Sequence, residues 1–395
     1  LHSDLSGRMM TLQFAIVALV TLDFTIVALL AYLYFLPFRL GPAPEKLLED
    51  GFFSAPGAMP DMRLYIDGAE AFDAVFEAIS RARKSVHIQT FIWKEDSLGR
   101  RMVEAVTAAA GRGASVTLSK DVLGTFFEIL GKGGKPGPIF TGSRGFGSKN
   151  ISVDFRSLKP VDHSKYYIID DNEVIFGGMN IADEYHDRWH DYMIGIYGSP
   201  LARSFAEKVV RKNPWPQDAP FVIATNTKHG AQIRTGIAQV IDSAQERLVL
   251  EHAYFSAGMI LEGIGRALAR GVAVDLILPK NPSTHGPANR AAVNLLLAGN
   301  HTERLRVFFY PTMTHAKALV ADGRIVAIGS ANMTPRSLFV AGETVMFAHF
   351  APDHPFVHRL NARLESDINA SERISAPFDM GPWERGKALV GKYIW

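Results

Sequence analysis

Two stretches of the sequence decide the fold: HSKYYIID at 163–170 and HAKALVAD at 315–322. Both place a histidine, a lysine and an aspartate at the same spacing, His-x-Lys-(x)4-Asp. Because side chains two apart on a strand share one face, the histidine and the lysine can both point at one phosphate group. The apolar residues after each lysine predict a buried strand. The predicted catalytic residues are His163, Lys165, Asp170, His315, Lys317 and Asp322.

Further polar residues repeat in register with the two histidines. GGMN ends at Asn180 and GSAN ends at Asn332, and their small residues allow close backbone approach while the amide can donate to a phosphoryl oxygen. A carboxylate follows each histidine by 28 residues, Asp191 in one copy and Glu343 in the other. A carboxylate that accepts the Nδ1 proton fixes the tautomer, so that Nε2 faces the substrate. We therefore predict two phosphate-binding asparagines and two histidine-orienting carboxylates.

The duplication extends well beyond the motifs. A helical pattern at 72–83 leads into an alternating run at 85–93, and 237–245 leads into 247–255 in the same way. Each run is followed by a small-residue helical segment, an Arg-Gly pair and another strand. Strand–helix–strand units favour a sheet with helices on its faces, so each half is predicted to be α/β.

Proline-rich and glycine-rich segments mark the domain boundaries. The boundary between the repeats is predicted at 213–220, because Pro214, Pro216 and Pro220 cannot continue a helix or a central strand. We predict a linker at 38–60, a first repeat at 61–216, and a second repeat with a C-terminal tail at 217–395. The Gly-, Ser- and Lys-rich segment 131–150 is expected to be a loop.

The N-terminal part predicts a membrane segment. Residues 1–8 read as a cloning remnant, and 9–37 are almost wholly apolar. A helix over 9–37 would be roughly 40 Å long, which is enough to span a bilayer. A secretory signal would have a shorter apolar core, a basic leader and a cleavage site. Asp23 lies near the middle of the run, where a carboxylate is costly. It is either a tolerated defect, or the mark of a helix that enters the membrane without crossing it, or part of an oligomer contact.

Composition excludes several other classes of site. The chain has 42 basic and 40 acidic residues, whereas a dedicated nucleic-acid binder usually shows a marked basic excess. It has no cysteine, which excludes disulfides, thiolate metal sites and a cysteine nucleophile.

Together these residues resemble the phospholipase D superfamily, from about Arg63 to Trp383. Within it the chain looks most like the bacterial cardiolipin synthases. The positions that match that family's pattern outside the two motifs are Asp96, Gly99, Arg112, Gly113, Trp189, Asp191, Tyr254, Phe255, Arg270, Gly271, Pro279, Arg336, Ser337 and Glu343. The chain departs from the pattern at the first motif, where the family usually has Asn-His-Arg-Lys and this chain has Asp162 and Ser164 in place of the asparagine and the arginine. It also has His252 and Ala253 in place of Thr-Pro, and Gly342 in place of asparagine.

The resemblance implies two pseudo-symmetric α/β/α repeats packed face to face, with one active site between them and no metal or cofactor. It implies a double displacement at phosphorus, with His163 as nucleophile and His315 as general acid and base. The pseudo-symmetry leaves the reverse order open. Lys165, Lys317 and the two asparagines would stabilise the phosphoryl oxygens. Asp170 and Asp322 are expected to form structural ion pairs.

The function expected from this resemblance is a membrane phosphatidyltransferase of cardiolipin synthase type, which makes cardiolipin and glycerol from two phosphatidylglycerol molecules. A phospholipase D hydrolase releasing phosphatidic acid is the alternative, and a nuclease is a weaker one. The expected partners are phospholipids and the lipid bilayer, with no nucleic acid and with homo-oligomers left open. The expected location is the bacterial cytoplasmic membrane, through the N-terminal helix.

Several weaker patterns leave alternatives open. His186 and His190 are four apart and could face a zinc ion on a helix, although surface histidines or a supporting role fit better. In the loop after Pro279, His285, Asn289 and Arg290 could contact a headgroup or be solvated. The apolar stretch 122–130 fits a core helix or a lipid interface, and the basic, aromatic tail at 387–395 fits a membrane surface or a frayed end.

Overall fold

The computed structural model describes residues 40–130, 149–156, 161–198, 220–227 and 230–394. These residues belong to one compact unit, Arg39–Tyr393. The predicted membrane segment with Asp23, most of the predicted loop at 131–150 and most of the proline-rich boundary lie outside the described residues. Within the described ranges, no helix has the length and apolar character needed to cross a membrane.

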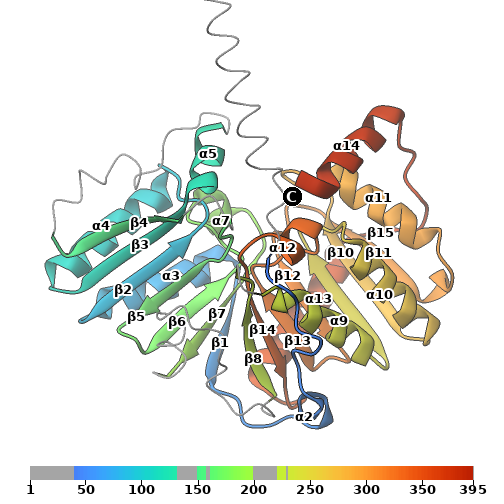
Figure 1. The fold of residues 1–395 in the computed structure, drawn as a ribbon, viewed down its shortest axis with the longest axis horizontal. Coiled ribbons are helices and arrows are strands. Elements are labelled where there is room, and N and C mark those ends of the chain that lie inside the picture. The colour runs from blue at the N-terminus through green and yellow to red at the C-terminus, as the bar shows by residue number, and fades with distance from the viewer. Residues whose placement is uncertain (1–39, 131–148, 157–160, 199–219, 228–229, 395) are drawn as a thin grey trace, which may run out of the picture. The chain divides into compact units, whose positions relative to one another are not determined.

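The first sheet is formed by residues 61–197 (Figure 1). Its seven strands are β1 (Asp61–Ile66), β2 (Ser85–Thr90), β3 (Ser115–Asp121), β4 (Ile151–Arg156), β5 (Tyr166–Ile169), β6 (Glu173–Gly177) and β7 (Tyr192–Tyr197). They are arranged in the order β1-β7-β6-β5-β2-β3-β4. β2, β3 and β4 run parallel, and the other neighbours pair antiparallel.

The second sheet is formed by residues 221–374 and repeats this topology. Its strands are β8 (Phe221–Thr225), β9 (Arg247–His252), β10 (Ala273–Pro279), β11 (Leu305–Tyr310), β12 (Lys317–Ala321), β13 (Ile325–Gly329), β14 (Thr344–His349) and β15 (Glu372–Ile374). The order is β15-β11-β10-β9-β12-β13-β14-β8, so seven strands match the first sheet one by one and β15 adds an edge. The internal repeat read from the sequence is therefore a repeat of structure.

Helices cover the outer face of each sheet. α3 (Asp67–Arg81) and α4 (Ser97–Gly111) pack on the first sheet, and α9 (Gln232–Ser243), α10 (Gly258–Ala269) and α11 (Gly286–Leu297) on the second (Figure 1). The remaining helices are α2 (Asp50–Ser54), α5 (Val122–Leu130), α7 (Asp183–Asp187), η1 (Thr302–Arg304), α12 (Pro335–Phe339), α13 (Pro355–Ala370) and α14 (Pro382–Ile394). The predicted helix at 122–130 is confirmed, and the predicted tail is helical over most of its length.

The inner faces of the two sheets pack against each other. One buried core cluster contains Ile168, Phe176 and Ile194 of the first sheet together with Ala318 and Ile328 of the second. Because both faces of each sheet are covered, the strands are apolar on both sides. The layer order is α/β/β/α, so the prediction of two α/β/α repeats is wrong in one respect: the second helical layer of each repeat is replaced by the other repeat's sheet. α13 adds Phe356, Leu360 and Leu364 to the same inner cluster.

The segment predicted to be a linker is packed where it is described. Leu48 and Phe52 are fully buried in the core of the second repeat. The side-chain oxygen of Gln239 accepts from the backbone N–H groups of Leu47 and Leu48. Residues 40–54 therefore form part of the second repeat, because their apolar side chains find a binding surface along α9.

The inter-sheet core can be tested with Phe176, which is fully buried. We expect Phe176→Ala to lower the free energy of unfolding by about 3–5 kcal/mol, since it leaves a cavity between two sheets that cannot close easily. Denaturant unfolding measures this. The control is Leu295→Ala, whose side chain is 64% exposed on α11, and its change should stay within about 0.5 kcal/mol. Equal effects of the two variants would contradict a shared core.

Candidate active site

Two short backbone bridges join the repeats at the site. Asp162 pairs with Gly342, and Thr314 pairs with His190. In the first bridge the N–H of His163 donates to the carbonyl of Gly342 over 2.8 Å. In the second the N–H of His315 donates to the carbonyl of His190 over 2.6 Å. The two bridges are related by the internal repeat, because each joins a residue just before a motif histidine to a residue just before a carboxylate.

The bridges bring each motif histidine against the carboxylate of the other repeat. Nδ1 of His163 lies 3.0 Å from Glu343 Oε1, and Nδ1 of His315 lies 2.7 Å from Asp191 Oδ2. Each carboxylate therefore contacts the histidine of the other repeat, not the one that precedes it by 28 residues. One consequence is that neither repeat forms a complete histidine–carboxylate pair alone.

The two carboxylates have different surroundings. Glu343 accepts hydrogen bonds from the hydroxyls of Ser330 and Ser337, and its contact with His163 and these donors lower its pKa against the effect of burial. Asp191 accepts from the backbone N–H of Tyr192. Burial raises the pKa of Asp191 to about 6, although Lys317 opposes this. Gly178 occupies the position of Ser330 in the repeat, and a Cβ there would lie 2.4 Å from both Asp191 oxygens.

Both motif lysines are buried at the site. Each donates from Nζ to the carbonyl of its own histidine, Lys165 to His163 and Lys317 to His315. Nζ of Lys317 also lies 2.8 Å from Nδ1 of His315. Burial lowers the pKa of Lys165 to about 7 and that of Lys317 to about 8.

The histidines respond to the same burial and charge. Burial and the two lysines hold the pKa of His315 well below its usual value, and burial with Lys165 lowers that of His163, although Glu343 opposes this. Four basic groups that are hard to charge in one place form a site that an anion would stabilise.

Aromatic rings pack against both motif histidines. Tyr185 packs edge-on to His315 at 5.0 Å between ring centroids, and Trp189 stacks on it at 5.7 Å. Phe91 packs edge-on to His163 at 4.9 Å. The His315 side chain is 4% exposed, while that of His163 is 17% exposed. Of the two histidines, His163 is therefore the more accessible.

The predicted phosphate-binding asparagines differ from each other. Asn180 accepts from the N–H of Ile92 through Oδ1 and donates to the Tyr185 hydroxyl through Nδ2. Asn332 is 5% exposed, and its Oδ1 has no hydrogen-bond partner in the described part of the chain. Asn180 is thus held by the protein, whereas the Asn332 amide keeps capacity for another contact.

Asp170 and Asp322 lie at the other end of their strands, roughly 20 Å along the chain from the histidines at about 3.3 Å per residue. Asp170 accepts from the backbone N–H groups of 83–85, and Asp322 from those of 245–247. The expected ion pairs are not found in the described part of the chain. The carboxylates instead accept from the backbone amides that lead into β2 and β9.

The weaker candidates are also resolved by position. α7 ends at Asp187, so His186 and His190 do not share a helix face, and His190 is buried. Asn289 bonds the backbone of 253 and 255, and Arg290 pairs with Glu384. Both ring nitrogens of His285 lack hydrogen-bond partners within the described ranges.

Some site residues could not be selected from the motifs. Ser330 and Ser337 hold Glu343, and Tyr185 packs on His315. Ser330 lies inside the GSAN stretch, directly after Gly329. That position was the only sequence feature that could have pointed to Ser330 as a site residue. His190, Glu251 and Asp367 form a buried group directly behind His315 that has the spacing of metal ligands.

The sequence is similar to proteins of known family. A family model described as "Cardiolipin synthase, PLD-like domain" matches residues 75–212 and 237–368. The cardiolipin synthase of Listeria innocua is 28% identical over 351 residues, covering 80% of this chain and 70% of that protein. Cardiolipin synthase A of Pseudomonas syringae is 28% identical over 347 residues, with the same two shares.

Solved structures share the fold. A phosphatidylserine synthase from Haemophilus influenzae superimposes with a TM-score of 0.67 at 13% identity, covering 90% of this chain and 93% of that one. A polyphosphate kinase from Porphyromonas gingivalis gives a TM-score of 0.56 at 16% identity, covering 89% and 58%.

The buried lysines predict a pH-dependent stability. Because the native pKa of Lys165 is about 7 and its usual value is 10.5, the unfolded chain binds more protons between these pH values. Stability contributed at this position therefore rises with pH across that window. We expect Lys165→Met to be more stable than the parent at pH 7 and to lose much of that advantage by pH 10, as measured by urea unfolding. Lys280→Met, at an exposed lysine, is the control, and a gap that does not narrow would contradict burial of a cation.

Proposed function

Because the chain belongs to the cardiolipin synthase family of phospholipase D-like domains, we propose that it is a phosphatidyltransferase that moves a phosphatidyl group between phospholipids. The resemblance read from the two motifs is confirmed by the family match. The proposed reaction joins two phosphatidylglycerol molecules into cardiolipin and releases glycerol.

The observation that carries the proposal is the crossed pairing of His163 with Glu343 and His315 with Asp191. The proposal is supported by two histidines, each with Nδ1 against a carboxylate, and by the two buried lysines beside them. A nucleophile and an acid, each held by its own carboxylate, are what a two-step displacement at phosphorus requires.

In the first step, Nε2 of His163 attacks phosphorus while the bond to the leaving alkoxide breaks. The leaving oxygen takes the Nε2 proton of His315 and departs as an alcohol. In the second step, neutral His315 accepts the proton of the incoming hydroxyl, the new P–O bond forms, and the P–N bond to His163 breaks. Both histidines return to their starting states, so protons and bonds balance.

The basic groups support this sequence when an anion is present. Burial and mutual repulsion lower the pKa values of His315, Lys165 and Lys317. A phosphodiester between them reverses the repulsion and favours the charged lysines and the protonated acid. We assign Nδ2 of Asn332 as the donor to a phosphoryl oxygen, while its Oδ1, an acceptor without a partner among the described residues, can accept from a hydroxyl of the substrate.

Exposure favours His163 as the nucleophile. Its side chain is more open than that of His315, and its partner Glu343 is held by two serine hydroxyls. An ionised carboxylate stabilises the positive charge that develops on a phosphohistidine ring. The rings of Tyr185 and Trp189 cover His315, which limits access of water and so favours transfer to an alcohol over hydrolysis.

The membrane assignment rests on the apolar run at 9–37. We propose that this segment anchors the protein in the bacterial cytoplasmic membrane, where both phospholipid substrates lie. Homo-oligomers are compatible with this arrangement and are tested by the size of the detergent-solubilised protein.

The substrate class is tested by giving purified full-length protein liposomes of phosphatidylglycerol and identifying the products by mass. Cardiolipin with glycerol supports the transferase. Phosphatidic acid alone would make the protein a hydrolase, and cleavage of single-stranded DNA without any lipid product would make it a nuclease.

Single replacement of either motif histidine tests the two-step mechanism. We expect His163→Ala and His315→Ala each to reduce turnover by at least about 10³-fold, because each removes a group that forms or breaks a bond. His358→Ala, at an exposed histidine on α13, is the control and should keep full activity. Retained turnover in both motif variants would rule the mechanism out.

The pH profile tests the role of Asp191. Since burial raises its pKa to about 6, activity should increase with pH through about 6 as the carboxylate ionises and accepts the Nδ1 proton of His315. We expect Asp191→Asn to slow the reaction by about 10²–10⁴-fold and to remove the limb of the pH profile in which activity rises near pH 6. Glu343→Gln is the matched comparison: it should also slow the reaction but leave the limb near pH 6 in place. A limb that survives in Asp191→Asn would assign it to another group.

A further inference from the structure

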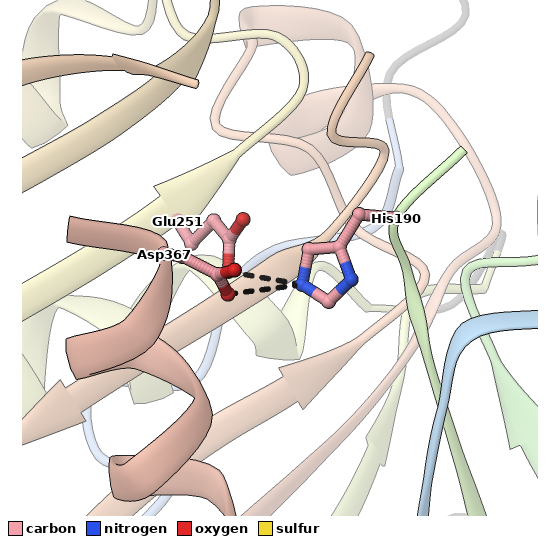
Figure 2. Close-up of side chains that lie close together, drawn as sticks. All are labelled: His190, Glu251 and Asp367. Atoms are coloured by element: carbon pink, nitrogen blue, oxygen red, sulfur yellow. Dashed lines mark ion pairs between the residues drawn. The ribbon is translucent and has the colours of Figure 1, made fainter. Parts of the chain in front are cut away.

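A buried group of metal-ligand type lies directly behind His315. It consists of His190, Glu251 and Asp367, which are 3%, 0% and 2% exposed. The three come from different elements: the loop before β7, strand β9 and helix α13. Figure 2 shows one ring nitrogen of His190 facing both carboxylates. One donor atom from each residue lies within 4.8 Å of the others.

The distances fit a cation better than a hydrogen bond. Nε2 of His190 forms ion-pair contacts of 3.5 Å with Glu251 Oε2 and 3.3 Å with Asp367 Oδ2, and neither contact has the geometry of a good hydrogen bond. Zinc lies about 2.0–2.2 Å from imidazole nitrogen and carboxylate oxygen, so two ligands of a tetrahedral site are about 3.3–3.5 Å apart. The two nitrogen–oxygen separations match that edge, and the two carboxylate oxygens lie within 4.8 Å of each other.

Outer contacts fix each of the three side chains. Nδ1 of His190 donates to Asp67 over 2.5 Å, which leaves Nε2 as the nitrogen that faces the carboxylates. The hydroxyls of Thr314 and Tyr192 donate to the two oxygens of Glu251. Nε of Arg363 donates to Asp367. A carboxylate on the second nitrogen of a histidine is the usual support of a metal-bound imidazole.

From this arrangement we propose that His190, Glu251 and Asp367 bind one divalent cation of the zinc class. An imidazole with two carboxylates suits zinc or a similar transition ion better than magnesium, which prefers oxygen ligands and retains water. The cation takes the place of a proton on Nε2, because Nδ1 bonds Asp67 and Nε2 is the nitrogen that faces both carboxylates. Binding therefore releases a proton and weakens as the pH falls.

Among the described residues, the equivalent positions of the other repeat do not form a matching site. In the equivalent strand of the first repeat, β2, Gln89 stands at the position of Glu251. Gly342 stands at the position equivalent to His190. Gln89 is fully buried and neutral. One cation per chain is therefore expected. Its place is structural, because it ties the first repeat, β9 and α13 together beneath the His190–Thr314 bridge and does not reach the reacting phosphorus.

The experiment measures metal without substrate, so its result is independent of the proposed activity. Full-length protein in detergent, produced with added zinc and freed of loose metal by a weak chelator, is analysed for metal per chain. We expect about one equivalent in the parent and in His358→Ala, and none in Glu251→Gln. Asp67→Asn should bind about 10–100-fold more weakly, since it removes the support of Nδ1. Cobalt in place of zinc should give the absorption of a four-coordinate site.

Two further measurements distinguish loss of metal binding from loss of folding. Asp367→Asn serves as a second ligand variant, and the far-ultraviolet spectrum and thermal midpoint of each variant are recorded with and without metal. The midpoint of the parent should rise with zinc but not with magnesium, and that of Glu251→Gln should not respond. No bound metal in the parent, or equal binding in the parent and both ligand variants, would overturn the proposal and leave a protonated His190 paired with its carboxylates.

Discussion

The two inter-repeat backbone bridges are the constraint on which the site depends. The N–H of His163 is fixed to Gly342 and that of His315 to His190, so each histidine is set against the carboxylate that follows in the other repeat. The sheets can supply this alignment because their inner faces pack directly and share one core. A site made in this way forms only when both repeats are folded and docked, which links catalysis to the stability of the inter-sheet core.

Within this two-fold frame the chain has different residues at matched positions. Ser330 donates to Glu343, whereas Gly178 at the same position leaves room for Asp191 and offers no hydroxyl. Burial raises the pKa of Asp191, whereas against the same burial His163, Lys165 and the Ser330 hydroxyl lower that of Glu343. Two carboxylates with separated pKa values allow two histidines to take different roles. The pseudo-symmetry of the fold therefore does not extend to the chemistry.

The repeats, the strands and the paired motifs could be predicted because they follow from local patterns. Alternation at 85–93 and 247–255 and the spacing within each motif need no tertiary information. The crossing of Asp191 with His315 could not be predicted, since it depends on how two sheets dock, and spacing favours residues of the same repeat. The prediction of an ion pair for Asp170 did not hold for a similar reason. Its partners are backbone amides, and the amino-acid sequence does not show which backbone amides a side chain will reach.

Burying so many ionisable groups is costly, and the cost explains their grouping. Lys165 and Lys317 are 1% exposed, and each stays inside because carboxylates from both repeats lie near it. On the other side of His315, His190 is balanced in the same way by Glu251 and Asp367. Removing a carboxylate leaves its basic partners buried and uncompensated, whereas removing a whole group returns the position to an apolar core. The first repeat agrees with this. Its position equivalent to Glu251 is the neutral Gln89, and the position equivalent to His190 is Gly342, so no histidine charge has to be balanced there.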